Sequence, residues 1–156
     1  MRKVPFKNYI YLILIVLVFG FAVYAVGNIY KQSKRVESDF YKFSNTITNK
    51  DFEVYITEYP NSIIYIYDKY STDYKEFEKE LQEKIESLYL KNNFVYFDKR
   101  ELNKKIINSM KENYNTELEY KSKPIIIIIL DKEVVNVINV DESTTIESLN
   151  LEVFEW

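Results

Sequence analysis

The feature that most constrains this chain is a stretch without any charged residue, from Tyr9 to Tyr30. As an α-helix rising ~1.5 Å per residue, this stretch is about 33 Å long, which is sufficient to cross a hydrocarbon core of ~30 Å. Tyrosines stand near both of its ends, as in the aromatic belts of membrane interfaces. Residues 9–30 are therefore predicted to form a transmembrane helix, and the lipid bilayer is a predicted partner.

A cleavable signal peptide is the alternative interpretation of this segment. The basic residues Arg2, Lys3 and Lys7 would form its charged start, and Ala25 and Gly27 would supply the small residues of a cleavage site near Gly27. The apolar stretch exceeds the ~7–15 residues that are usual in such signals. This length favours a retained anchor over secretion after cleavage.

The orientation of the anchor follows from what comes after it. Basic residues flank the span on both sides, so the positive-inside rule does not decide between the two orientations. Long domains are translocated largely regardless of charge, and a chain without cysteine suits an oxidising exterior. Abundant Lys, Ile, Asn and Tyr indicate an AT-rich bacterial genome. We expect residues 1–8 to be a short cytoplasmic tail and the C-terminal domain to lie outside a bacterial plasma membrane.

The composition excludes several kinds of chemistry. The 156 residues include no cysteine and no histidine, so thiol redox chemistry, imidazole bases and the usual transition-metal sites are ruled out. The net charge of −3 and the lack of a basic patch argue against nucleic-acid binding. Three carboxylates, Asp68, Asp73 and Asp98, could gather to hold a hard cation, but the preferred interpretation is an acidic rim. We expect no metal and no cofactor.

Hydrophobic patterning predicts one α/β domain over 44–156, joined to the membrane span by a helical stalk over 31–43 that is exposed to solvent. Apolar runs predict strands over 62–68, 94–98 and 124–130, each buried on both faces. Apolar residues at helical spacing predict helices over 52–59, 74–89 and 101–114. The alternating order implies a central sheet with a parallel core and helices on both faces, to which a hairpin over 124–140 adds an antiparallel edge.

This order of elements resembles the thioredoxin fold, with Pro124 at the start of the penultimate strand in the place of that family's cis-proline. The segment "YSTDYK" (70–75) lies where thioredoxins carry W-C-x-x-C-K. The resemblance places Ser71 and Tyr74 at the two cysteine positions, which makes them degenerate redox-site positions. The predicted fold is therefore a thioredoxin-like mixed sheet flanked by helices, preceded by one transmembrane helix.

Within this group the chain is most similar to the membrane-attached bacteriocin transport accessory proteins of Gram-positive bacteria. Their C-P-x-C-x-x-F pattern aligns with Ser71, Thr72, Tyr74 and Phe77, and Asp98 ends the second predicted strand as in that group. The similarity implies a membrane-anchored, redox-inactive accessory protein that acts through contact with a membrane or extracytoplasmic protein, such as a transporter or secretion component. On this interpretation the chain is not an enzyme.

Two further hypotheses remain open. A peptide-binding, chaperone-like module would grip extended chains by strand addition beside Pro124. Its groove would comprise Tyr70, Tyr120, Lys123, Pro124 and Ile125, and it requires a cis bond before Pro124 and an unfilled groove. A hydrolase would use Ser71 as nucleophile, although no histidine base is present. The simpler interpretation of Ser71 and Thr72 is that one of them caps the following helix.

Overall fold

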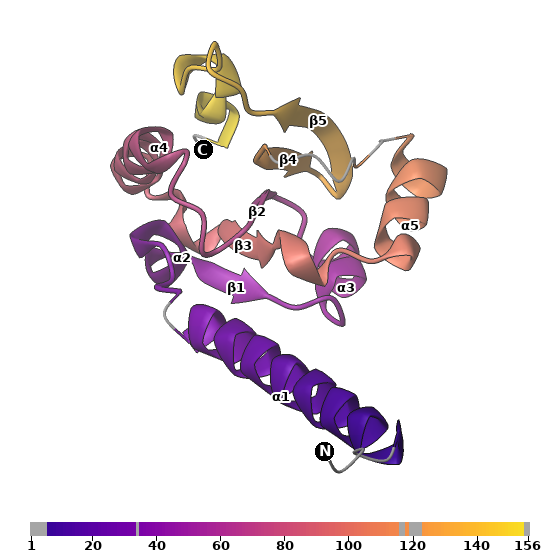
Figure 1. The fold of residues 1–156 in the computed structure, drawn as a ribbon. Helices are drawn as coiled ribbons and strands as arrows, with labels where there is room; N and C mark the ends of the chain where they lie inside the picture. The colour runs from indigo at the N-terminus through magenta and orange to yellow at the C-terminus, as the bar shows by residue number, and fades with distance from the viewer. Residues whose placement is uncertain (1–5, 34, 116–117, 119–122, 155–156) are drawn as a thin grey trace. The chain divides into compact units, whose positions relative to one another are not determined.

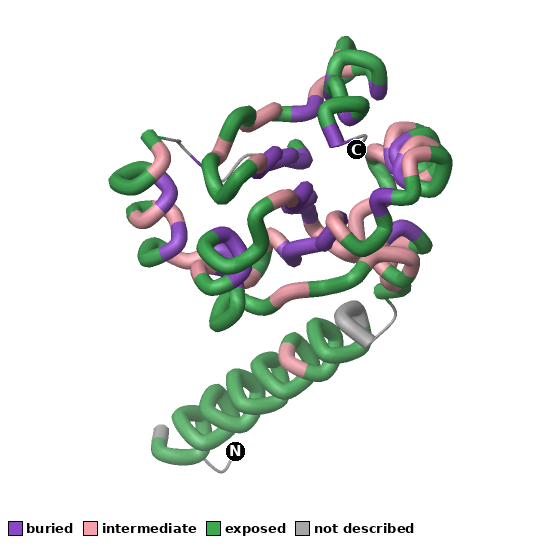
Figure 2. The backbone as a smooth tube through the Cα atoms, turned by 180° about the vertical axis from the view of Figure 1, so that it is seen from behind, coloured by how far each residue is buried: buried purple, intermediate pink, exposed green. Residues whose placement is uncertain are grey.

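The computed structural model of the chain describes residues 6–33, 35–115, 118 and 123–154 (Figure 1). The chain divides into two compact units, residues 1–36 and 37–156. The first unit contains helix α1 (Phe6–Ser33). Its large apolar side chains from Tyr9 to Tyr30 are exposed, and the helix is coloured as exposed along nearly all of its described length (Figure 2). Over Lys7–Tyr30 this helix is long and apolar enough to cross a membrane.

The second unit begins earlier than the sequence predicts. Helix α1 ends at Ser33, and a separate short helix, α2, spans Asp39–Phe43. The Ser38 hydroxyl caps α2 by accepting a hydrogen bond from the Tyr41 N–H at 3.1 Å. Phe40 is 3% exposed and belongs to the core of the second unit. The prediction of a solvated helical stalk over 31–43 is therefore wrong from Glu37 onward, because Phe40 and Phe43 belong to a short helix that packs on the core.

Five strands form one mixed sheet in the order β1-β3-β2-β4-β5. Their bounds are β1 Asn45–Ile47, β2 Ser62–Tyr67, β3 Phe94–Asp98, β4 Ile125–Leu130 and β5 Glu133–Asn139. β1 and β2 run parallel to β3, whereas β4 runs antiparallel to both β2 and β5. The strands at the centre are continuous apolar runs because helices cover both faces of the sheet.

The antiparallel part of the sheet starts one strand earlier than expected. Ile125 pairs with Ile66, so β4 begins at the end of the sheet where β2 finishes. The predicted hairpin between β4 and β5 is confirmed. Its turn residues Asp131 and Lys132 both have left-handed backbones, with φ of 51° and 68°. Such a turn usually contains glycine, and no glycine follows Gly27 in this sequence.

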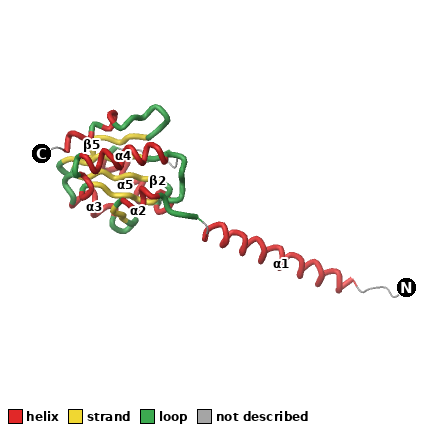
Figure 3. Tube along the Cα trace, turned by 90° about the vertical axis from the view of Figure 1, so that its left-hand side faces the viewer, coloured by secondary structure: helices red, strands yellow, loops and turns green. Residues whose placement is uncertain are grey.

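Helices cover the two faces of the sheet in pairs, α2 with α4 and α3 with α5 (Figure 1). α3 spans Phe52–Glu58, α4 spans Lys75–Ser87 and α5 spans Lys104–Tyr114. Figure 3, turned by 90°, shows α4 in front of the strands. Short 3-10 helices complete the unit: η1 Leu90–Asn92, η2 Lys99–Glu101, η3 Glu147–Leu149 and η4 Leu151–Phe154.

The core has two layers that the sheet separates. Along β2, Tyr65 and Tyr67 face the α2 and α4 layer, whereas Ile64 and Ile66 face the α3 and α5 layer. All six residues of β2 are buried, as expected for a central strand. The α/β class, the mixed five-stranded sheet and the helices on both faces confirm the thioredoxin-like architecture predicted from the sequence.

Candidate functional site

The candidate site is the corner that joins β2 to α4, residues 68–74. It begins with a tight turn at Asp68, whose side-chain oxygen accepts a hydrogen bond from the Tyr70 N–H at 3.0 Å. The Asp68 carbonyl accepts a second one from the Ser71 N–H at 2.9 Å. An aspartate commonly stabilises such a turn with its own side chain. The corner is therefore a hydrogen-bonded turn that begins at the carboxyl end of β2.

Ser71 occupies the first cysteine position of the resemblance, and its hydroxyl is engaged within the fold. It lies 2.7 Å from the Tyr67 hydroxyl and accepts a long hydrogen bond from the Asp73 N–H at 3.4 Å. Burial raises the pKa of Tyr67, so this phenol does not act as a base at neutral pH. A serine nucleophile needs a neighbouring base. This arrangement gives the Ser71 hydrolase hypothesis no support.

The predicted cap on α4 is also wrong. The helix begins at Lys75, and Tyr74 precedes it without a side-chain capping hydrogen bond. Ser71 and Thr72 lie too far ahead of the first helical turn, because residues 71–74 form the corner. Ser71 stabilises the corner rather than the helix end.

Tyr74 occupies the second cysteine position. Its ring packs edge-on against Tyr67, with 5.5 Å between the ring centroids. The residue is half-buried, and it borders a pocket of about 410 Å³ with Lys123, Asp141, Glu142 and Ser143. The corner and the segment before β4 therefore line one pocket.

The structure corrects the expectation for Pro124. Among the described residues no peptide bond is cis, so the Lys123–Pro124 bond is trans. The Pro124 carbonyl accepts a hydrogen bond from the Val140 N–H at 2.9 Å. Ile125 is buried and pairs with Ile66 on one side and with Asn139 on the other. From Ile125 onward β4 lies between two strands, so it leaves no free strand edge beside Pro124 within the described residues. Tyr120, the remaining residue of the predicted groove, lies outside the described residues.

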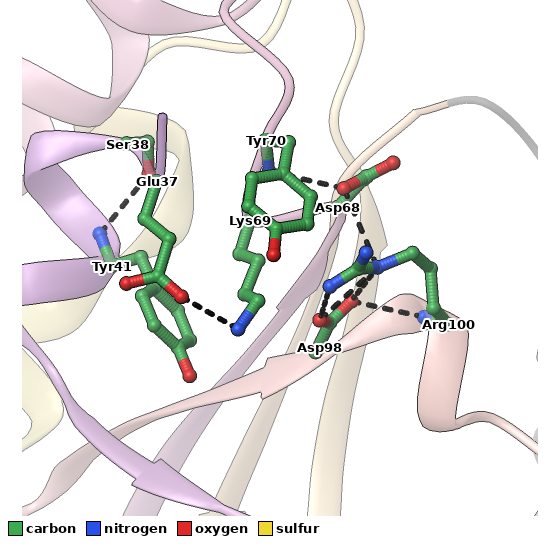
Figure 4. A network of polar contacts seen from close by, with 8 residues as sticks. All are labelled: Glu37, Ser38, Tyr41, Asp68, Lys69, Tyr70, Asp98 and Arg100. Atoms are coloured by element: carbon green, nitrogen blue, oxygen red, sulfur yellow. Dashed lines mark hydrogen bonds and ion pairs between the residues drawn. The ribbon is translucent and has the colours of Figure 1, made fainter. Parts of the chain in front are cut away.

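An ionic cluster closes the carboxyl ends of β2 and β3 (Figure 4). The Arg100 guanidinium donates through Nε to both Asp98 carboxylate oxygens, at 3.0 and 3.2 Å, and through a second nitrogen to the same carboxylate. The same Nε lies 3.6 Å from an Asp68 oxygen, and the guanidinium stacks 4.3 Å from the ring centroid of Tyr70. The Asp98 carboxylate raises the pKa of Arg100. Asp68 and Asp98 thus lie on either side of one guanidinium.

A second cation ties the corner to α2. Lys69 Nζ lies 2.6 Å from a Glu37 carboxylate oxygen and 4.8 Å from the ring centroid of Tyr41. The Lys69 carbonyl accepts a hydrogen bond from the Ser38 N–H at 2.7 Å. Glu37, Lys69 and Arg100 were not predicted as site residues, because the ion pairs Lys69–Glu37 and Arg100–Asp68 each join residues 32 positions apart, and the Arg100–Asp98 pair lies in a turn without periodicity. The corner is held from two sides by charge-assisted contacts.

Polar groups are also buried beneath the corner. Glu78 is 4% exposed in the first turn of α4, and its carboxyl accepts a hydrogen bond from the Tyr65 hydroxyl at 3.1 Å. Burial raises the pKa of Glu78 to about 7. The Tyr96 hydroxyl and Lys99 Nζ are buried without a hydrogen-bond partner in the described part of the chain, and burial lowers the pKa of Lys99. Glu78 could not be singled out from the sequence, because α4 carries several other glutamates.

No protein-family model matches the sequence, and no curated protein sequence matches it. Among solved structures, the chain is similar to mitochondrial thioredoxin 3 of Saccharomyces cerevisiae in its oxidised form. The identity is 18%, the match covers 64% of this chain and 86% of that chain, and the TM-score is 0.45.

A second similar chain belongs to a solved structure described as the structural basis of the thiol resolving mechanism in yeast mitochondrial 1-Cys peroxiredoxin via glutathione/thioredoxin systems. It is 21% identical, the match covers 64% of this chain and 85% of that chain, and the TM-score is 0.44. The thioredoxin-like class defined above rests on the strand order, the strand directions and the placement of the helices in this structure.

Proposed function

We propose that this protein is a membrane-anchored thioredoxin-like accessory protein that has no redox activity and acts through protein–protein contact. The observation that carries the proposal is the state of the corner. Ser71 and Tyr74 stand at the dithiol positions, and both contact Tyr67 within the fold. The thioredoxin-like fold is retained, whereas the two positions of the dithiol carry Ser71, which hydrogen-bonds to Tyr67, and Tyr74, which packs on Tyr67.

The proposed location combines the span with the resemblance to bacteriocin transport accessory proteins. Lys7–Tyr30 would anchor the chain in a bacterial plasma membrane, with residues 1–8 in the cytoplasm and the folded unit outside. The partner would be a membrane or extracytoplasmic protein, such as a transporter or secretion component. Secretion after cleavage near Gly27 remains the alternative, and the mass of the mature protein from membranes distinguishes the two.

The surface proposed for contact is the rim of the pocket beside Tyr74. Lys123, Glu142 and Ser143 are exposed there. The Asp141 carboxylate accepts hydrogen bonds from the Ser143 N–H at 3.0 Å and from the Ser143 hydroxyl at 2.7 Å, and these bonds lower the pKa of Asp141. Opposite charges on a preformed rim suit recognition of a polar protein surface.

Insulin reduction tests the absence of redox activity. The full chain in detergent micelles is compared with the double variant Ser71→Cys/Tyr74→Cys, which restores a dithiol at the same corner. The native chain is expected to leave the background rate of dithiothreitol unchanged. An accelerated rate with the native chain would overturn the proposal. An accelerated rate with the double variant alone would show that the missing thiols, and not the scaffold, account for the inactivity.

A further inference from the structure

The edge of the sheet formed by β1 is open. Asn45, Thr46 and Ile47 pair with β3 on one side, and in the described part of the chain no backbone hydrogen bond is made on the other side of β1. Asn45 and Thr46 are exposed. Figure 1 shows β1 as the outermost strand at its end of the sheet. An unpaired edge presents N–H and C=O groups to which another extended chain can add.

A groove of about 450 Å³ runs beside this edge, between β1 and helix α3. Its aromatic wall is the stacked pair Tyr55 and Tyr59, with ring centroids 4.3 Å apart and an angle of 19° between the rings. Tyr55 is buried, whereas Tyr59 is 50% exposed and the neighbouring Val54 is 49% exposed. These side chains leave apolar surface uncovered next to the open strand.

The ionisable groups of the groove, apart from its tyrosines, are acidic. Among the described residues that line it, Asp51 and Glu58 carry carboxylates and none is Lys or Arg. The nearby Lys91 is directed to another site, since its Nζ lies 4.5 Å from the ring centroid of Phe43. A strand added to β1 would project alternate side chains toward α3, where they would meet carboxylates and an aromatic ring.

We propose that β1 and this groove bind an extended, basic segment of a partner protein by strand addition. Lysine or arginine side chains at alternate positions would pair with Asp51 and Glu58, and their aliphatic stems would pack on Tyr59. None of the lining residues belongs to the corner or to its pocket. The proposal therefore concerns a second surface and stands independently of the redox state of the corner.

A second copy of this chain is the less favoured occupant. The three residues of β1 carry no positive charge. A two-fold pairing of β1 with itself would also bring two acidic grooves to one interface, where like charges repel. A basic segment complements the groove in both charge and backbone hydrogen bonding.

The test uses the full chain in detergent micelles and three fluorescein-labelled peptides at low salt. The first is Lys-Val-Lys-Val-Lys-Val-Lys, the second replaces every Lys by Glu, and the third replaces the central Val by Pro, which cannot donate to the strand ladder. Fluorescence anisotropy is expected to give binding about tenfold tighter for the first peptide than for each of the other two. Equal binding of the Lys and Glu peptides, or undiminished binding of the Pro peptide, would overturn the proposal.

Charge-reversed variants locate the binding. Glu58→Lys in the groove is expected to weaken binding of the Lys peptide about fivefold or more. Glu83→Lys, an equal charge change on the exposed face of α4, is expected to leave binding unchanged. Equal losses in the two variants would mean general attraction to an acidic protein and would overturn the site. So would a concentration-dependent dimer, seen by sedimentation, that the Lys peptide fails to dissociate.

Discussion

The Tyr65 hydroxyl donates a hydrogen bond to the Glu78 carboxyl at 3.1 Å, and both residues are buried between β2 and α4. This pair links the central strand to the first turn of the helix that follows the corner. Burial disfavours the charged form of the carboxyl and raises its pKa to about 7, while the hydrogen bond from Tyr65 partly opposes this change. The protein therefore contains a carboxyl group that changes its charge near neutral pH.

Folding stability is expected to fall as the pH rises from about 4.5 to 7. Below pH 4.5 Glu78 is protonated in both the folded and unfolded states, so it contributes no pH dependence. Between these pH values the unfolded chain releases the proton first, so the free energy of unfolding decreases, by about 3 kcal/mol in total for a shift from 4.5 to about 7. Urea denaturation followed by near-ultraviolet circular dichroism at several pH values measures this change.

Glu78→Gln is the matched control for this prediction, since the amide oxygen can still accept from Tyr65 without titrating. As the pH rises from about 4.5 to 7, the native chain should lose stability while Glu78→Gln does not, so the variant should become progressively more stable than the native chain. Parallel pH profiles for the two proteins would show that Glu78 has an ordinary pKa in the folded state.

Loss of Arg100 is expected to destabilise the fold through Asp98. The Asp98 side chain is 8% exposed, and Arg100 is its charged partner. Arg100→Ala would leave a buried carboxylate with fewer partners, at a cost of about 2 kcal/mol, because the guanidinium itself is partly exposed to solvent. The double variant Arg100→Ala/Asp98→Asn removes the unpaired charge and should recover part of the loss. If Arg100→Ala and the native chain have the same urea midpoint of unfolding, the Arg100–Asp98 pair contributes nothing to stability.

Phe40 is expected to behave as a core residue. Its ring lies 5.2 Å from Tyr65 and 5.4 Å from Phe94, measured between centroids. Phe40→Ala should cost about 3–5 kcal/mol because it leaves a cavity in the layer beneath α2. Val36 is 73% exposed, and Val36→Ala should change stability by less than about 0.5 kcal/mol. Similar small effects in the two variants would restore the interpretation of this segment as a solvated stalk.

Two substitutions in the β4–β5 turn are expected to increase folding stability. Asp131 and Lys132 both adopt left-handed backbones, which Asn and Gly adopt at lower cost. The double variant Asp131→Asn/Lys132→Gly should raise stability by about 1 kcal/mol. Thermal unfolding measures the gain, and an unchanged or lower midpoint would contradict the turn geometry. The Lys132 N–H that donates to the Pro60 carbonyl at 2.9 Å remains in the variant.

Burial patterns were the reliable part of the sequence analysis. The strands β2, β3 and β4 were predictable because a central strand must be apolar on both faces, and α4 and α5 because their apolar residues recur at helical spacing. The same spacing misled at Phe40, since it does not distinguish a helix that packs on a sheet from one in solvent. The C-terminal residues Leu149, Leu151 and Phe154 are buried in short 3-10 turns, which have no long repeat to recognise.

The site was less predictable, because its contacts join distant segments. The resemblance led to Ser71 and Tyr74, and both lie in the corner between β2 and α4. The position of Pro124 in the resemblance suggested a cis bond, but the Lys123–Pro124 bond is trans. The roles of Arg100 and Glu78 could not be predicted, because a single Arg after a strand and one Glu among several on a helix are usually exposed surface residues.

Photo-crosslinking in native membranes tests most directly whether the protein acts by contact with a partner at the pocket beside Tyr74. Benzophenone-alanine is placed at Glu142, on the rim beside Tyr74, and at Glu83 on the exposed face of α4 as the control. We expect one discrete adduct with a membrane or extracytoplasmic protein from position 142 and none from position 83. The absence of any adduct at 142, or the same adducts at both positions, would contradict it.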